Sequence, residues 1–175
     1  MISIMRQVIY SAAASLDGFI ASPDGTADWI PPDPDVDFAS MFARFDTVLL
    51  GRKTYEEALK MGGLFPGLEA FVFSNSKPPD SAPNVEWVSG SPVALVADLR
   101  KRSGKDLWVM GGGELAGEFL KEDLLDGVQI AICPLLIGSG IPMFGATGFP
   151  QRAFRLANHR VYPKSGIVML DYERA

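Results

Sequence analysis

The stretch of this sequence best suited to bind a ligand is a glycine turn between an apolar run and a helical pattern. The run, residues 107–110, has the length of a buried strand, and the pattern after the turn places Phe119 and Leu120 on one helix face. Such a turn directs N–H groups and the positive end of a helix dipole at a phosphate. The alternative is a tight turn that needs glycine only for its backbone angles. The residues expected to bind are Gly111, Gly112, Gly113, Glu114 and Leu115.

Polar stretches follow two other apolar runs, residues 48–50 and 70–73, in the same way. In a parallel α/β sheet, ligands bind beyond the carboxyl ends of the strands. N–H groups, hydroxyls and cations there would hold a pyrophosphate, and an arginine fork beside serines fits a 2′-phosphate, which favours NADPH over NADH. For each cation taken alone, a solvated surface residue is the simpler interpretation. The cofactor residues expected here are Gly51, Arg52, Lys53, Thr54, Ser74, Asn75 and Ser76, with Lys77 beside them.

A hydride transfer also needs a source for a proton, and three aspartates are the catalytic candidates. They are Asp17, Asp35 and Asp37. The alternative for Asp17 is a structural role in its turn, and the alternative for one of the other two is capping of the helix that follows. His159 lies in an expected terminal strand, where a structural role is the simpler interpretation, and Cys133 is expected to be a buried core thiol.

The segment over residues 22–37 is a long loop with five aspartates and neither Arg nor Lys. Loops of this length inside a compact domain are usually functional or disordered. Trp29 in its middle either covers a ring-shaped substrate or anchors the loop. The carboxylates would repel an unpaired substrate phosphate. They instead suit an uncharged or cationic substrate.

Apolar periodicity predicts strands that alternate with helices and close in a hairpin. Strands are expected at residues 8–14, 48–50, 70–73, 85–88, 107–110, 128–133, 154–162 and 166–172. The apolar spacing of residues 36–45 predicts a helix that ends at Asp46 and Thr47. A second helix is expected to begin at Gly51, with Tyr55 and Leu59 on its inner face. A third helix begins at Ser91-Pro92 and stops at Gly104. The pattern indicates one α/β domain over residues 1–175, with a mainly parallel sheet and an antiparallel edge.

An ordinary Rossmann domain is disfavoured, although Gly111, Gly113 and Ala116 fit the G-x-G-x-x-A fingerprint. The match lies late in the chain. The next expected strand ends in Cys133-Pro134, where that fold has an acid for the ribose.

Composition excludes several classes of protein. The chain has 175 residues, 47% of them hydrophobic, and a net charge of −5, which argues against nucleic-acid binding. It shows neither a membrane-length apolar run nor a signal-peptide pattern. One cysteine and one histidine exclude an internal disulfide and a multi-histidine zinc site. A cytoplasmic protein without a structural metal is expected.

Four spaced motifs resemble the dihydrofolate-reductase-like superfamily, and most closely the reductase domain at the C-terminus of the bacterial bifunctional riboflavin-biosynthesis protein. They are SLDGFIA at 15–21, GRKTY at 51–55, GGGEL at 111–115 and PLLIGSGIPMF at 134–144. The resemblance implies about eight strands with flanking helices and NADPH across the strand ends. It places Gly51, Arg52 and Thr54 near the cofactor phosphates, Ser74 near the 2′-phosphate and residues 111–114 at the pyrophosphate. It also implies a homodimer.

The leading hypothesis is an NADPH-dependent reductase that delivers hydride to a C=N or C=O bond of a small heterocycle. By resemblance the substrate is a riboflavin-pathway pyrimidine, as for a 5-amino-6-(5-phosphoribosylamino)uracil reductase. Dihydrofolate or pterin reduction is an alternative, and Asp35 or Asp37 would then match the carboxylate that borders the pterin site. A further alternative is an NADPH-binding protein without reductase activity. The zinc deaminase domain that usually accompanies the riboflavin enzyme is not expected in these 175 residues, because one cysteine and one histidine are too few for its zinc ligands.

Overall fold

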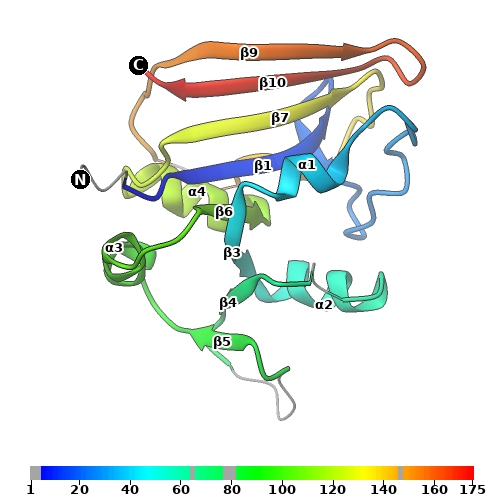
Figure 1. Ribbon diagram of the computed structural model, residues 1–175. Coiled ribbons are helices and arrows are strands. Elements are labelled where there is room, and N and C mark those ends of the chain that lie inside the picture. The colour runs from blue at the N-terminus through cyan, green and yellow to red at the C-terminus, as the bar shows by residue number, and fades with distance from the viewer. Residues whose placement is uncertain (1–4, 64–65, 77–81, 146–147) are drawn as a thin grey trace.

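The computed structural model describes residues 5–63, 66–76, 82–145 and 148–175. Within these residues, eight strands form one sheet in the order β5-β4-β3-β6-β1-β7-β10-β9 (Figure 1). A separate pair joins β2, Phe19–Ala21, to β8, Ile141–Pro142. The strands of the large sheet are β1 Val8–Ser15, β3 Phe45–Gly51, β4 Glu69–Phe73, β5 Val85–Val88, β6 Asp106–Gly111, β7 Gly127–Cys133, β9 Phe154–Tyr162 and β10 Ile167–Arg174.

The six strands from β5 to β7 run parallel, and β10 is antiparallel to both β7 and β9. This arrangement confirms the predicted parallel sheet with an antiparallel edge, and also the terminal hairpin. Because the six strands are parallel, their carboxyl ends all lie at one border of the sheet. The loops that carry the predicted site residues leave from that border.

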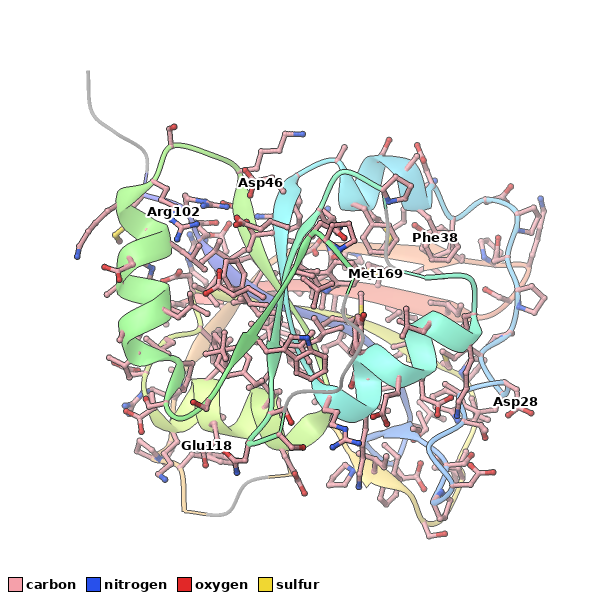
Figure 2. All side chains as sticks on the ribbon, turned by 90° about the horizontal axis from the view of Figure 1, so that it is seen from below. Asp28, Phe38, Asp46, Arg102, Glu118 and Met169 are labelled. Atoms are coloured by element: carbon pink, nitrogen blue, oxygen red, sulfur yellow. The ribbon has the colours of Figure 1, made fainter. Side chains whose placement is uncertain are left out.

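Helices cover both faces of the sheet. Helices α3, Pro92–Lys101, and α4, Gly113–Lys121, pack on one face, while α1, Phe38–Phe42, and α2, Arg52–Lys60, lie on the other (Figures 1 and 2). The predicted start of α3 is confirmed, because the Ser91 hydroxyl accepts a hydrogen bond from the Val93 N–H.

The central strands β1, β3 and β6 contain continuous apolar runs because both faces of the sheet are buried there. In β3, the consecutive residues Val48, Leu49 and Leu50 are fully buried. Leu49 packs under α3 and α4, whereas its two neighbours face α2. A smaller cluster at the end of the hairpin is covered by the 22–37 loop, and Trp29 packs into it. Trp29 therefore anchors its loop.

The helical spacing ahead of β3 predicts a longer helix than the chain forms. Helix α1 ends at Phe42, and β3 already begins at Phe45, so Asp46 and Thr47 lie inside the strand. These polar residues are accommodated because buried Arg6 donates hydrogen bonds to the Asp46 carboxylate and to the Thr47 hydroxyl. The partner that makes the strand possible lies far away in the sequence, which is why local periodicity misses it.

Two further expectations are wrong. Leu59 does not face the core: its side chain is 49% exposed, and Tyr55 is the buried residue of α2. Gly104 is not the stop of α3, whose C-cap is Arg102. Gly104 is needed for close approach instead, since a Cβ there would lie 2.5 Å from the Asp46 carboxylate. Strand β8 and its pairing with β2 were also not predicted, because β8 has only two residues.

Candidate functional site

The three predicted phosphate-binding stretches follow strands that are direct neighbours in the sheet. β3 lies between β4 and β6, and the strand register pairs Gly51 with Phe73 on one side and Leu50 with Gly111 on the other. The serine turn after β4, the start of α2 after β3 and the glycine turn after β6 are therefore consecutive along one border. This adjacency is the main support for a common ligand site.

The three glycines of the turn serve different purposes. Gly111 has a φ of +121°, a region that favours glycine. Gly113 lies against the 142–145 segment, since a Cβ there would be 2.0 Å from the Pro142 carbonyl oxygen, and its own carbonyl accepts from the Gly145 N–H at 2.9 Å. Backbone shape and packing therefore explain two of the three glycines. Gly112 is the one whose surroundings point to a ligand.

Gly112 and Gly51 are the N-caps of α4 and α2. Because glycine has no side chain, neither cap can supply the acceptor that Ser or Asp would offer to the first-turn N–H groups. The two helix starts are also close together: a Cβ on Gly112 would lie 3.4 Å from Thr54 Oγ1, and one on Gly51 would lie 3.7 Å from the Gly112 nitrogen. Two adjacent helix N-termini can bind a pyrophosphate.

Arg52 joins α2 to the serine turn. Its Nη1 donates to Ser76 Oγ at 2.7 Å, and its Nε donates to Glu56 Oε1 at 2.6 Å. The turn is closed by Ser74, whose Oγ donates to the Ser76 carbonyl and accepts from the Ser76 N–H. Arg52 therefore lies beside the serine turn, as expected, and binding of a phosphate between them stays a prediction. Glu56 was not among the predicted site residues, although its position four residues after Arg52 is a known signal for a helix ion pair.

The other predicted cofactor residues lie at the same border but make no contact that argues for a ligand. Lys53, Asn75 and Glu114 are exposed, and Leu115 is half-buried against the core. Lys77 lies outside the described residues. Glu114 adds an acid to the first turn of α4, which stabilises the helix dipole.

Asp17 ties the turn after β1 to a distant segment. Its carboxylate accepts from Ser15 Oγ at 2.6 Å and from the N–H groups of Ile137 and Gly138 at 3.2 and 2.7 Å. The hydrogen bond from Ser15, followed by those from the two backbone groups, lowers the pKa of Asp17 below its ordinary value. This shift works against Asp17 as a proton donor at neutral pH, because the carboxyl group is held ionised.

The other two catalytic candidates also have structural partners. Asp37 is the N-cap of α1, and its carboxylate accepts from both the N–H and the Oγ of Ser40. These bonds, led by the one from the Ser40 hydroxyl, lower the pKa of Asp37. Asp35 pairs with Lys164 in the hairpin turn at 2.9 Å. The structure does not bring Asp17 together with these two residues through any contact of its described residues.

Asp33 is the aspartate of the loop that sequence reasoning overlooked. It is only 8% exposed, and it accepts from the backbone N–H groups of Ser165 and Asp35 at 3.0 and 2.9 Å. Hydrogen bonding, first from the Ser165 side chain and then from the Asp35 backbone, lowers its pKa. Asp33 is therefore held ionised but is shielded from solvent, and the Lys164 ammonium balances the charge of Asp35.

Three further observations concern a metal site, the single thiol and a membrane span. No group of three or more His, Cys, Asp or Glu residues is placed there to hold a metal ion. Cys133 is buried, which raises the pKa of its thiol, and His159 is exposed on β9. No described helix is long and apolar enough to span a membrane.

Comparison with known proteins identifies the family. The sequence matches the model of the RibD C-terminal domain over residues 6–61 and 71–168. The chain belongs to this family. The resemblance inferred from the four motifs is thereby confirmed, and the eight-stranded, mostly parallel sheet is of the dihydrofolate-reductase type.

Three relatives illustrate the range of similarity within this family. The uncharacterized protein YwjB of Bacillus subtilis (strain 168) is 35% identical over 144 residues, which are 79% of this chain and 83% of YwjB. The riboflavin biosynthesis protein RibD of Corynebacterium ammoniagenes is 26% identical over 145 residues, 74% of this chain but 43% of RibD. A crystal structure from Shewanella sp. PV-4, provisionally named a riboflavin biosynthesis protein, has 32% identity and a TM-score of 0.84 over 97% of this chain and 99% of that one.

Proposed function

We propose that this protein is an NADPH-dependent reductase that acts on a small heterocycle, of the pyrimidine type found in riboflavin biosynthesis. The observation that carries the proposal is the alignment of three phosphate-binding elements on the adjacent strands β4, β3 and β6. Membership of the RibD C-terminal domain family supports the same activity.

The residues along this border fit the parts of the cofactor. The uncapped helix starts at Gly51 and Gly112, with Thr54 between them, suit the pyrophosphate. Arg52 and Ser76 suit the 2′-phosphate, because a guanidinium binds phosphate oxygens in a fork. When bound, the cofactor supplies the hydride, and the chain supplies binding, orientation and exclusion of water.

A pyrimidine substrate that bears a ribose phosphate is compatible with the acidic loop. The loop sequence alone predicts repulsion of such a phosphate. In the fold, however, the Lys164 ammonium balances the charge of Asp35, and Asp33 is only 8% exposed, with its carboxylate bound by backbone N–H groups. The relative RibD of C. ammoniagenes is named for riboflavin biosynthesis, which supports this substrate class ahead of a pterin.

An NADPH-binding protein without reductase activity is the second candidate, and one observation favours it. The carboxylates of Asp17, Asp35 and Asp37 all have structural partners, so the proton donor is not evident among them. Within the reductase proposal all three stay candidates. Asp35 differs from the other two because its carboxylate pairs with an exposed lysine, Lys164, and not with backbone N–H groups.

Titration with NADPH and NADH, followed by thermal shift or tryptophan fluorescence, tests the proposal. A ligand that binds only the folded state stabilises it by about 2.7 kcal/mol at a hundredfold excess over Kd. We expect stabilisation by NADPH at lower concentration than by NADH. Loss of NADPH absorbance with a pyrimidine substrate, and not with dihydrofolate, then identifies the reductase. No shift with either cofactor at millimolar concentration contradicts the proposal, and binding without turnover supports the second candidate.

We also propose that two copies of the chain associate through the hairpin edge. β9 is an edge strand of nine residues, about 30 Å long, on which Leu156 and Val161 are 49% and 56% exposed (Figure 1). A long edge with exposed apolar side chains is a template for pairing, and a two-fold axis lets the strand meet its own copy. Analytical ultracentrifugation should give a dimer, and Val161→Lys should give a monomer. A wild-type monomer at tens of micromolar contradicts this proposal.

A further inference from the structure

The guanidinium of Arg52 has two neighbours of different chemistry. Its Nε donates to the carboxylate of Glu56, one turn further along α2, and its Nη1 donates to the hydroxyl of Ser76. Ser76 is held in turn by Ser74 through hydrogen bonds in both directions. The arginine is thus fixed along its Nε edge, while its Nη end lies at the serine turn.

We propose that Glu56 is a positioning residue that orients Arg52 to recognise a phosphate monoester on the ribose of the cofactor. This inference rests on the proposed NADPH site. An arginine side chain loses much rotamer freedom when it binds a ligand. Because Glu56 already restricts the guanidinium, part of this entropy is lost before the ligand binds. The contact uses the Nε edge and leaves Nη atoms for the phosphate oxygens.

The negative charge of Glu56 works against the same phosphate, so the two effects must be compared. The side chains of Arg52 and Glu56 are 48% and 45% exposed, and water and salt therefore screen the repulsion. Orientation of the guanidinium is not screened. Because exposed ion pairs contribute little to folding, Glu56 variants remain folded and the effect on binding can be measured.

The neighbouring residue Glu57 offers a matched control. It lies on the same helix, is 42% exposed and pairs with Lys60 at 2.6 Å, away from Arg52. Glu57→Ala removes the same charge from α2 as Glu56→Ala does. A difference between the two variants therefore reports on the contact with Arg52 and not on the net charge of the helix.

Calorimetric titration with two cofactor fragments tests the inference without any catalytic step. Adenosine 2′,5′-bisphosphate carries the ribose phosphate, and adenosine 5′-monophosphate lacks it. We expect Glu56→Ala to raise the Kd for the bisphosphate by about five- to tenfold, the size of a weakened charge-assisted contact. Binding of the monophosphate should change less than twofold. Glu56→Gln keeps an acceptor for Nε and should restore wild-type Kd to within about twofold, and Glu57→Ala should leave both Kd values unchanged.

Each other result has a definite meaning. Tighter binding of the bisphosphate by Glu56→Ala would show that repulsion dominates, and an unchanged Kd would show that Arg52 needs no support. Equal weakening in Glu56→Gln, or in Glu57→Ala, would assign the effect to charge. All four outcomes overturn the positioning role and leave the NADPH site intact. Failure of the wild-type protein to bind either NADPH or the bisphosphate contradicts the proposed function instead.

Discussion

The sheet border formed by the carboxyl ends of the parallel strands has two regions, and they are built in different ways. On the proposed cofactor side, each predicted stretch directly follows its own strand, and its contacts join neighbouring strand ends, as between Arg52 and Ser76. On the proposed substrate side, the turn after β1 and the 22–37 loop have partners more than a hundred residues away, as in the contact of Asp35 with Lys164. Helix starts and strand ends define the first region, and long-range hydrogen bonds define the second.

This difference has a physical consequence for how each region tolerates change. The proposed cofactor side presents backbone N–H groups at helix starts, so we expect binding there to depend on glycine geometry and on a few side chains. The substrate side uses aspartates whose partners are backbone groups of the 137–138 segment and of the hairpin turn. Its shape therefore depends on tertiary packing. Mutations should separate the two regions, and the expected effects differ in size.

The largest effect is expected at the glycine turn. Gly113→Ala places a Cβ about where the Pro142 carbonyl oxygen lies, 2.0 Å away, and backbone must move to relieve the overlap. We expect a loss of about 3 kcal/mol in the free energy of unfolding, the upper end of the cost of overpacking. Urea denaturation measures it.

Gly112→Ala is the matched control in the same turn. Its Cβ would meet Thr54 Oγ1 at 3.4 Å, a contact that the threonine can relieve by a small shift. We expect stability to change by less than about 1 kcal/mol, whereas affinity for NADPH falls. An equal loss of stability in both variants would contradict the distinction between a packing glycine and a ligand glycine.

The second effect is on cofactor choice. Arg52→Ala should weaken NADPH binding by about ten- to hundredfold, the value of a hydrogen bond to a charged group, and NADH binding much less. Lys53→Ala, which removes an exposed cation from the adjacent position, is the control. Fluorescence titration gives both Kd values. Equal losses for NADPH and NADH would exclude Arg52 as the residue that recognises the 2′-phosphate.

The same contrast explains how far the sequence predicts the molecule. The parallel sheet, the hairpin and the three marked strand ends follow from apolar runs, glycines and helix-start residues, because each signal is local. Adjacency of the strand ends after β4, β3 and β6 is confirmed by the strand order. The extra length of β3 was missed because it depends on Arg6, which lies about forty positions before Asp46 and Thr47 in the sequence.

The two regions of the candidate site also differ in how well the sequence predicted them. Arg52 and the serine turn were predicted to lie side by side at two strand ends, and the hydrogen bond between Arg52 and Ser76 shows that they do. The state of the acidic loop was not predictable, since Lys164 and Ser165 reach Asp35 and Asp33 only after the hairpin has folded against the loop. Residue type alone predicts a repulsive surface there, whereas tertiary contacts bury Asp33 and pair Asp35 with Lys164.

The third effect concerns pH and the substrate side. The folded-state pKa of Asp33 is lowered by its hydrogen bonds, so its stabilising contribution is present above the ordinary carboxyl pKa near 3.9 and is lost as pH falls through the lower folded value. Asp33→Asn should therefore be less stable than wild type at pH 7, with the difference shrinking below about pH 4. Urea unfolding across this range measures it, with Asp28→Asn as a control in the same loop. A difference that is independent of pH would contradict the assignment.

The smallest effect is expected at the contact between the hairpin and the loop. Lys164 and Asp35 are 61% and 47% exposed, and an exposed pair contributes roughly 0.2–1 kcal/mol, so Lys164→Ala should barely change stability. Its NADPH affinity should equal that of wild type, because β10 and β9 are separated from β3 by β6, β1 and β7. KM for a phosphorylated pyrimidine should nevertheless rise, since the loop then faces the substrate with one more unpaired carboxylate. A fall in NADPH affinity with unchanged KM would show that the two sides of the border are not independent, because a change confined to the substrate side would have reached the cofactor side.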